Sequence, residues 1–415
     1  MRNVPTRIGL FGHFGCGNSG NDGSLEAMLT FLRQLRPDAE LVCICPAPDR
    51  VRQDYGVRVL GFGWLGSGSS FFRSLDRLLL RGPHILASWI HTIRQVRKFD
   101  LLIIPGTGIL DDFSTGPWGM PYVLFRWCLT AKLCGTKVWF VSIGAGPIHH
   151  PMSRWLMKCA AAMAQYRSYR DTISKEFMDS IGFDTRTDPV YPDIAFKLPA
   201  PECSSPRHSD GEALTIALGV MSYGGWLDDP KRGARIFDIY LKNMTRFLIW
   251  LLDRGYRVRI LMGDTADRRA VDDLMRAVAA EGRTITPEML SAEPTLSLHD
   301  LMRQIALTDI VVATRFHNVV CALKLGKPTI SVGYADKNDV LLAEMGLGDF
   351  CQHIERLDVH LLIKQFTMLV ADRKKHEQII KEVNRAYRER LAHQDALLAR
   401  RLFPSSQAAA LYADL

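Results

Sequence analysis

Arg315 and His317 lie two residues apart in the stretch Thr-Arg-Phe-His-Asn, which follows an apolar run. The pattern predicts a strand that ends just before a helix begins, and α/β proteins bind ligands at such carboxyl strand ends. Arg315 offers a planar fork to a carboxylate or phosphate, and the helix start offers free N–H groups. The imidazole of His317 can move a proton near neutral pH. The stretch, with Phe316 and Asn318 in it, therefore predicts an anion site with acid–base chemistry.

The same residues also have a purely structural interpretation. Arg315 would then pair with a nearby carboxylate, and His317 would only cap the helix. Taken alone, the stretch does not decide between the two interpretations.

A polar glycine turn lies near the N-terminus, in the stretch GCGNSGNDG at residues 15–23. Its glycines have the Gly-x-Gly-x-x-Gly spacing of dinucleotide-binding loops. The acidic residue that would bind the ribose at the end of the second strand is missing. Asn18 and Asp22 crowd the turn, and Asp22 would cap the next helix and place negative charge where a pyrophosphate would sit. We therefore predict a sugar-facing or structural loop and no nicotinamide or flavin cofactor.

Two more strand ends carry candidate residues. Gly108, Asp111 and Asp112 follow one predicted strand in the stretch GTGILDD, and Arg170 follows another in YRDTIS. A glycine turn on its own is most simply a tight turn, and an acidic residue in a turn most often caps a helix. These residues are candidates because ligands bind at the carboxyl ends of parallel strands.

Strand-like and helix-like segments alternate along the chain, which is typical of doubly wound α/β domains. Prolines and small polar residues at 198–212 indicate a linker. We predict Rossmann-like domains at residues 1–197 and 213–356 that face a cleft, and C-terminal helices at 357–415. Within the last segment, residues 372–401 would form a long helix that returns over the first domain. The predicted strands are residues 7–12, 40–45, 100–105, 137–143 and 165–169, then 214–221, 257–262, 309–314 and 328–332.

Size and composition bound the class of protein. A chain of 415 residues, 47% of them hydrophobic, is long enough for two cores. The 9 cysteines are scattered without metal-ligand spacing, which predicts a reducing cytosol and neither disulfides nor an essential metal. A net charge of +8 favours anionic partners, and without a basic run interleaved with aromatic residues we expect no nucleic acid among them. With neither a membrane-span-length apolar run nor a signal peptide, we expect a cytoplasmic protein.

Residues 70–98 combine bulky apolar residues with basic ones at helical spacing. This profile is typical of helices on an anionic membrane surface, and it also occurs in core helices with a solvated basic face. The first interpretation predicts peripheral attachment at the inner membrane face. The basic residues of the segment are Arg73, Arg77, Arg81, Arg94, Arg97 and Lys98.

Taken in order, the motifs resemble those of the polysaccharide pyruvyl transferase family. The resemblance extends from residue 7 to about residue 350, and six loose motifs in this order over two domains are specific. The motifs are GNSGND at 17–22, GTGILD at 106–111, SIGAGP at 142–147, YRDTIS at 169–174, DIAF at 193–196 and RFH at 315–317.

The resemblance implies a glycosyltransferase-B-like fold, with the donor on the second domain and the acceptor on the first. It implies transfer of pyruvate from phosphoenolpyruvate to a sugar or glycan, free or lipid-linked, as a ketal bridging two hydroxyls. Arg315 and His317 match the family's donor-binding and catalytic pair, and Arg170 matches its other donor-site arginine. His317 suits the general acid that protonates the methylene carbon. The acceptor-binding or base candidates are Asn18, Asp22, Gly108, Asp111 and Asp112.

Two rival functions remain open on the sequence alone. A nucleotide-sugar glycosyltransferase of the same fold would use Asp336 and Glu344, whose spacing suits a donor ribose. A non-catalytic protein that binds a glycan or a lipid carrier would not need Arg315 and His317 side by side.

Overall fold

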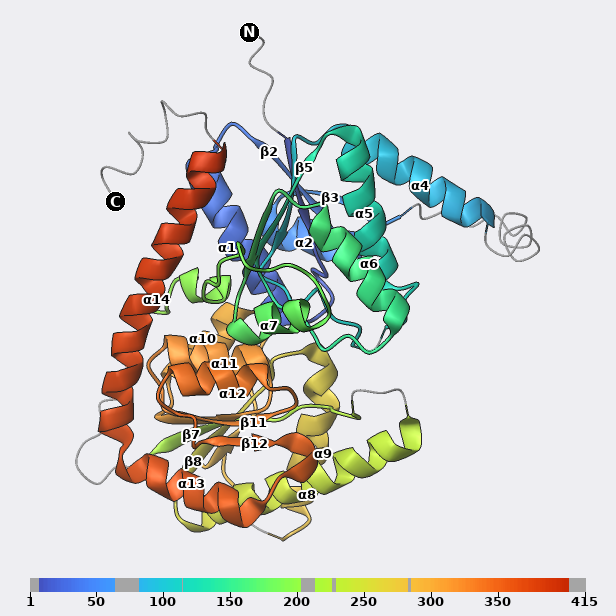
Figure 1. The fold of residues 1–415 in the computed structure, drawn as a ribbon. Helices are drawn as coiled ribbons and strands as arrows, with labels where there is room; N and C mark the ends of the chain where they lie inside the picture. The colour runs from blue at the N-terminus through green and yellow to red at the C-terminus, as the bar shows by residue number, and fades with distance from the viewer. Residues whose placement is uncertain are drawn as a thin grey trace. The chain divides into compact units, whose positions relative to one another are not determined.

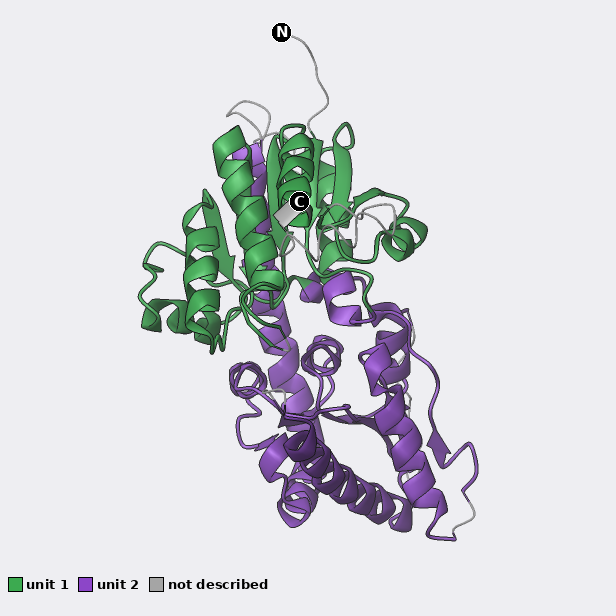
Figure 2. Ribbon diagram, turned by 90° about the vertical axis from the view of Figure 1, so that its right-hand side faces the viewer, with its two compact units in different colours: residues 1–16, 24–194 green, residues 17–23, 195–415 purple. Residues whose placement is uncertain are grey.

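The computed structural model describes residues 7–63, 82–113, 115–202, 213–225, 229–282 and 285–402. The chain divides into two compact units, which Figure 2 shows in different colours. Unit 1 comprises residues 1–16 and 24–194, and unit 2 comprises residues 17–23 and 195–415. Most of the polar glycine turn therefore clusters with unit 2, although the strand before it belongs to unit 1.

Unit 1 is built on a six-stranded parallel sheet. Its strands are β1 Arg7–Phe11, β2 Glu40–Ile44, β3 Arg58–Leu60, β4 Leu101–Pro105, β5 Lys137–Ile143 and β6 Tyr166–Tyr169, in the order β3-β2-β1-β4-β5-β6. Its helices are α1 Ser19–Leu35, α2 Pro48–Tyr55, α4 Gly82–Val96, α5 Met120–Cys134, α6 Pro151–Ala162 and α7 Thr172–Ser180. Figure 1 shows α4, α5 and α6 on one face of the sheet and α1 on the other. The central strands are apolar and buried because helices cover both faces.

Unit 2 repeats this architecture with a second parallel sheet. Its strands are β7 Thr215–Gly219, β8 Arg257–Leu261, β9 Leu290–Ser291, β10 Ile310–Ala313, β11 Thr329–Gly333 and β12 Cys351–His353, in the order β12-β11-β10-β7-β8-β9. Its α-helices are α8 Pro230–Asp253, α9 Arg268–Ala279, α10 Leu298–Ala306, α11 Phe316–Lys324, α12 Lys337–Glu344, α13 Val359–Ala371 and α14 Arg373–Leu402. Three short 3-10 turns complete it, η1 Ile194–Lys197, η2 Thr265–Asp267 and η3 Ile354–Arg356, the first of which spans the division between the units.

Side-chain caps fix where several helices of unit 2 begin. The carboxylate of Asp229 accepts the N–H of Arg232 at the start of α8, and Asp358 accepts two N–H groups at the start of α13. Ser297 caps α10 in the same way. Each cap satisfies a backbone donor that the helix itself leaves without a partner, so the local sequence fixes these boundaries.

Helix α14 is held against unit 2 by polar side chains near its middle. The amide of Asn384 donates to the carbonyl of Leu323 at 2.8 Å, and the hydroxyl of Tyr387 donates to the carboxylate of Glu344. These contacts join α14 to the ends of α11 and α12. The long C-terminal helix is as the sequence predicts, whereas its return over the first domain stays a prediction.

The strands predicted from the sequence are all confirmed, with ends that differ by no more than two residues. The sequence does not predict β3, β9 and β12, which are edge strands of two or three residues. The prediction for the first helix is wrong at its start, because α1 begins at Ser19 and Asn18 caps it in place of Asp22. Residues 70–81 of the amphipathic segment, with Arg73, Arg77 and Arg81, lie outside the described residues. Of the helices that the structure describes, none has the length and apolar character needed to span a bilayer.

Candidate functional site

The carboxyl end of β10 carries the Arg-Phe-His stretch, as the sequence predicts. The strand is fully buried, and Arg315 is the residue that precedes α11. Phe316 is buried, and its ring meets the imidazole of His317 edge to face with centroids 5.2 Å apart. The N-terminal N–H groups of α11 therefore lie beside both side chains at the edge of the unit 2 sheet.

Two carboxylates surround the guanidinium of Arg315. Nε donates to one oxygen of Asp267 at 2.9 Å and a terminal nitrogen donates to the other at 2.8 Å. A carboxylate oxygen of Asp264 lies 3.7 Å from the remaining terminal nitrogen. Although burial alone would lower it, the contact with Asp267 holds the pKa of Arg315 above its ordinary value. The planar fork of Arg315 is thus already occupied, which is what the structural interpretation of this residue requires.

Asp267 can hold Arg315 in one orientation because burial and a backbone hydrogen bond hold Asp267 itself in place. Its side chain is fully buried, and its Oδ1 also accepts the backbone N–H of Ser222 at 3.0 Å. Ser222 follows β7, so Asp267 connects two strand ends of the same sheet. The Arg315 side chain therefore has one defined position rather than a choice of partners.

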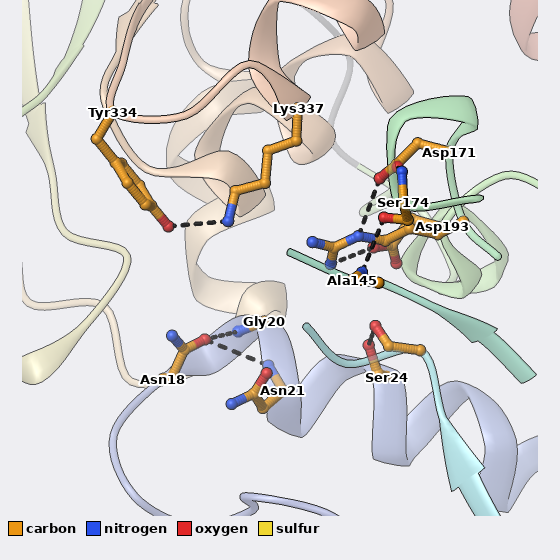
Figure 3. Close-up of polar contacts among 12 residues, drawn as sticks. Asn18, Gly20, Asn21, Ser24, Ala145, Asp171, Ser174, Asp193, Tyr334 and Lys337 are labelled. Atoms are coloured by element: carbon orange, nitrogen blue, oxygen red, sulfur yellow. Dashed lines mark hydrogen bonds and ion pairs between the residues drawn. The ribbon is translucent and has the colours of Figure 1, made fainter. Parts of the chain in front are cut away.

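The imidazole of His317 packs against the first turn of α1. A Cβ placed on Gly20 would lie 1.9 Å from Nδ1 of His317, so only glycine lets the ring come this close. The side chain of Asn18 accepts the N–H groups of Gly20 and Asn21 at 3.1 and 3.3 Å and caps the helix there (Figure 3). Asp22, in the same turn, is buried. The turn that carries two acceptor candidates, Asn18 and Asp22, thus lies beside His317 through Gly20.

The glycine turn is attached to unit 2 at a second point. Asn18 forms a β-bridge with Asp264, and the N–H of Thr265 donates to the carbonyl of Gly17 at 3.3 Å. Because Asp264 also lies beside Arg315, the turn and the Arg-Phe-His stretch form one polar cluster within unit 2.

Asn318 is a fully buried amide between two glycines. A Cβ on Gly219 would lie 2.7 Å from its Nδ2, and a Cβ on Gly263 would lie 2.4 Å from its Oδ1. Within the part of the chain that the structure describes, neither amide atom has a hydrogen-bond partner. An unsatisfied buried amide costs about 1–3 kcal/mol, so a protein that keeps one has a reason such as a ligand or a water molecule.

Lys337 is a cation at this strand edge that the sequence prediction missed. Its Nζ donates to the hydroxyl of Tyr334 at 3.1 Å (Figure 3) and lies 5.5 Å from the ring centroid of Phe316. Tyr334 and Lys337 follow β11, so the rule that selected the other strand ends would also have selected this one. The sequence prediction named only Asp336 at this strand end, the carboxylate one position earlier, as a candidate for binding a donor ribose.

In unit 1, Arg170 is buried and paired. Its guanidinium lies 3.3 Å from a carboxylate oxygen of Asp171 and 3.4 Å from one of Asp193. A Cβ on Gly144 would lie 2.6 Å from the same guanidinium, so the glycine of the SIGAGP motif makes room for it. Asp171 also caps α7, by accepting the N–H of Ser174 at 2.7 Å.

The acidic residues of the GTGILDD stretch differ in their surroundings. Asp112 is buried and accepts the backbone N–H groups of His149 and His150 at 2.9–3.0 Å, which ties its loop to the start of α6. Asp111 is half-buried and accepts the N–H of Phe113 at 3.2 Å. A Cβ on Gly108 would lie 3.6 Å from the Asp111 carboxylate. Asp112 thus has a structural role, and Asp111 is the more accessible carboxylate.

The predicted residues therefore form two groups. Unit 2 brings together the Arg-Phe-His stretch, Asn318, Asn18 and Asp22, whereas unit 1 brings together Gly108, Asp111 and Arg170, with Asp112 nearby. Over the described ranges, no cluster of three or more His, Cys, Asp or Glu side chains is arranged to hold a metal ion.

The two sheets, their strand orders and the long C-terminal helix define a glycosyltransferase-B-like protein. Solved structures with this fold include the UDP-GlcNAc 2-epimerase from Neisseria meningitidis bound to UDP-GlcNAc, with 10% identity, a TM-score of 0.55 and coverage of 94% of this chain and 100% of that one. A UDP-forming α,α-trehalose-phosphate synthase from Burkholderia vietnamiensis has 12% identity, a TM-score of 0.53 and coverage of 99% of both chains. At this level of identity the likeness shows the fold.

The family follows from the sequence. The model of the polysaccharide pyruvyl transferase family matches residues 18–336, and the chain belongs to this family. The match begins within the glycine turn and ends at Asp336, one residue before Lys337. No curated protein matches the sequence.

Proposed function

We propose that the protein transfers the pyruvyl group of phosphoenolpyruvate to a sugar of a polysaccharide or of its lipid-linked precursor. The product is a ketal that bridges two sugar hydroxyls, and phosphate is released. The observation that carries the proposal is the strand edge of unit 2. There the N-terminus of α11, the buried amide of Asn318 and the imidazole of His317 lie together. The chain also belongs to the pyruvyl transferase family.

Donor binding follows from the charges at this edge. Phosphoenolpyruvate carries a carboxylate and a phosphate, which suit the first N–H groups of α11 and the ammonium of Lys337. The amide of Asn318 offers one donor and one acceptor that the described structure leaves unused. Asp267 occupies two N–H groups of Arg315, and the remaining terminal nitrogen lies 3.7 Å from Asp264, beyond hydrogen-bond distance; we assign the N–H groups of that nitrogen to the donor as well. Arg170, held in unit 1, is proposed as the second donor arginine on the family resemblance.

Catalysis requires a proton at the methylene carbon of the donor. Protonated His317 gives its proton to that carbon, and the adjacent carbon becomes electrophilic. One sugar hydroxyl bonds to this carbon, and the second then displaces phosphate. Of the two hydroxyl protons released, one restores His317 and the other leaves on the phosphate. Asp22 and Asp111 are the base candidates, because Asp112 is engaged by two backbone N–H groups.

The rival glycosyltransferase function has a weaker structural basis. Its donor ribose would need the carboxylates of Asp336 and Glu344, and the carboxylate of Glu344 accepts the hydroxyl of Tyr387 on α14. A non-catalytic glycan or lipid-carrier binder is the other alternative. It would bind its ligand without releasing phosphate from phosphoenolpyruvate.

We also propose that the reaction needs no cofactor and takes place in the cytoplasm, with contact to the inner face of the membrane where the acceptor is lipid-linked. Phosphoenolpyruvate is a cytosolic metabolite and carries the only activated group in the scheme. Activity should persist after treatment with a metal chelator. Loss of activity that a single added metal ion restores would contradict the absence of a metal.

The experiment is a transfer assay with phosphoenolpyruvate and a panel of oligosaccharides, read by phosphate release and by mass spectrometry of the pyruvylated product. Lys337→Met should raise the KM for phosphoenolpyruvate about tenfold, because it removes one charged contact. The matched control is Lys381→Met, an exposed lysine on α14, which should leave KM unchanged. Transfer of a sugar from a nucleotide sugar, with no phosphate released from phosphoenolpyruvate, would refute the proposal.

A further inference from the structure

Three neighbouring helices of unit 1 share an unusual composition. Helices α4, α5 and α6 pack side by side on one face of the sheet (Figure 1), and their sequences contain no Asp or Glu. Among the described residues of the unit, the other helices, α1, α2 and α7, each contain acidic residues. Exposed basic residues on the three helices are Arg94, Lys132 and Arg154.

The same helix layer exposes large apolar side chains. Trp118, in the loop before α5, is 73% exposed, Leu86 on α4 is 62% exposed and Trp155 on α6 is 53% exposed. Exposed side chains of this size and number are uncommon on the surface of a monomeric protein. Ile85, Ile90 and Met152 are also exposed there.

Ring contacts connect these side chains across the three helices. The indole N–H of Trp89 donates to the hydroxyl of Tyr122 at 2.9 Å, and the Tyr122 ring lies 5.7 Å from that of Trp118. The rings of Phe125 and Trp155 lie 5.6 Å apart. Tyr122 and Phe125 are three residues apart on α5, so they lie on one side of that helix. We call this surface the aromatic face, made of Leu86, Trp89, Trp118, Tyr122, Phe125 and Trp155.

The aromatic face lies at one edge of unit 1. Helices α4, α5 and α6 each lead into a parallel strand of the same sheet, so all three begin at the carboxyl ends of the strands. Their partly positive N-termini therefore share an edge with Trp118, which precedes α5, and with Leu86 and Trp155, the fifth residues of α4 and α6. Arg154, next to Trp155 near the start of α6, is an exposed basic residue at this edge, whereas Arg94 and Lys132 lie in the last turns of α4 and α5.

We propose that the aromatic face docks on an anionic phospholipid surface. Indole rings favour the boundary between headgroups and acyl chains, and basic side chains and helix N-termini attract anionic headgroups. A second copy of the chain would bring the helix N-termini and Arg154 beside this face against their own like charges. Charge therefore favours lipid as the occupant.

The aromatic face lies next to candidate acceptor-binding residues in the sequence, which suggests a function for docking. Trp118 shares the β4–α5 loop with Gly108 and Asp111, which are acceptor candidates. On the proposed function, docking would bring these residues near a sugar acceptor that is anchored in the membrane. This last step rests on the proposed function, whereas the docking itself does not.

Sedimentation with lipid vesicles tests the proposal. The full chain should sediment at low salt with vesicles that contain phosphatidylglycerol and not with pure phosphatidylcholine vesicles. The double variant Trp118→Ser with Trp155→Ser should bind about tenfold or more weakly, because it removes two interfacial indoles. Arg154→Glu, next to Trp155, should weaken binding and reduce its salt dependence.

The matched control is Leu296→Ser with Leu361→Ser, two exposed leucines of unit 2, which should sediment as the parent does. All variants should bind phosphoenolpyruvate as the parent does, which separates this proposal from the proposed function. Failure of the parent to sediment with anionic vesicles, or equal sedimentation of the tryptophan variant, would overturn the proposal. So would a parent dimer that the tryptophan substitutions convert to a monomer, since the face would then cover a second copy.

Discussion

At the scale of single residues, the position of His317 depends on glycine at position 20, which has no side chain to fill the space that the imidazole occupies. The ring lies so close to Gly20 that a methyl group there would overlap Nδ1, at 1.9 Å. Gly20→Ala should therefore displace the imidazole and lower kcat by roughly 10²-fold, as His317→Ala does if His317 is the proton donor. The KM for phosphoenolpyruvate should change by less than this. Steady-state kinetics of the two variants measures both quantities.

The control for Gly20→Ala is Gly348→Ala, because a Cβ at that exposed position makes only ordinary contacts at 3.6 Å. It should keep the parent kcat. If Gly20→Ala and His317→Ala are both within a few-fold of the parent, His317 is a helix-start residue without a catalytic role.

A second residue-scale prediction concerns the buried pair of Arg315 and Asp267. Arg315→Ala should lower the free energy of unfolding by about 3–5 kcal/mol, because it leaves a fully buried carboxylate without its partner. Loss of donor binding in that variant would therefore be ambiguous. The double variant Arg315→Met with Asp267→Leu should recover most of the stability and still fail to bind phosphoenolpyruvate. Chemical denaturation and calorimetry of both variants check these two outcomes.

Retention of donor affinity by the stable double variant would mean that Arg315 has only a structural role. The sequence could not decide this point, because Asp267 lies 48 positions away and only the fold brings it to Arg315. The sequence pattern predicts that Arg315 and His317 lie at a strand end, but it does not show which carboxylate pairs with Arg315. Lys337 could have been predicted, since it follows a predicted strand, whereas the solitary amide of Asn318 depends on two distant glycines.

At the scale of elements, α11 connects the site to the C-terminal part of unit 2. Its last residue, Lys324, donates to the carbonyl of Phe196 at 2.6 Å, and Asn384 on α14 donates to the carbonyl of Leu323. Burial lowers the pKa of Lys324 to about 8 from its ordinary 10.5. The protonated form is thus less favourable in the folded chain than in the unfolded chain.

This pKa predicts how stability changes with pH. Between pH 8 and 10.5 the unfolded chain holds a proton on Lys324 that the folded chain has released, so the free energy of unfolding rises with pH. The difference of 10.5 − 8 = 2.5 units corresponds to about 3 kcal/mol over the whole range. Urea unfolding at pH 7 to 10.5 should therefore show the parent gaining stability relative to Lys324→Gln. A difference between the two proteins that does not change with pH would contradict the assignment.

Elements were predictable from the sequence in proportion to their length and burial. Strands such as β4 and β5 are continuous apolar runs, because a parallel sheet is covered on both faces. The edge strands β3, β9 and β12 are too short to show a pattern. The sequence alone predicts too late a start for α1 because Asn18 and Asp22 both suit a cap, and only the hydrogen bonds of Asn18 decide between them.

At the scale of the whole molecule, the alternation of strands and helices predicts two Rossmann-like domains, and the family resemblance adds the glycosyltransferase-B-like fold; the two parallel sheets confirm both. The grouping of residues 17–23 with unit 2 was not predictable, because it depends on contacts with η2 and α11 that are far away in the sequence. That grouping assigns Asn18 and Asp22 to the unit that carries His317. It makes Asp22 a base candidate in the same unit as the proposed proton donor.

The central claim is that the strand edge of unit 2 binds phosphoenolpyruvate as the donor. Its most direct test is calorimetric titration of the full chain with phosphoenolpyruvate and, separately, with UDP-GlcNAc, the ligand of a structural neighbour. Phosphoenolpyruvate should give saturable heat that Lys337→Met weakens, and UDP-GlcNAc should give none. Saturable binding of UDP-GlcNAc with no heat from phosphoenolpyruvate would contradict it.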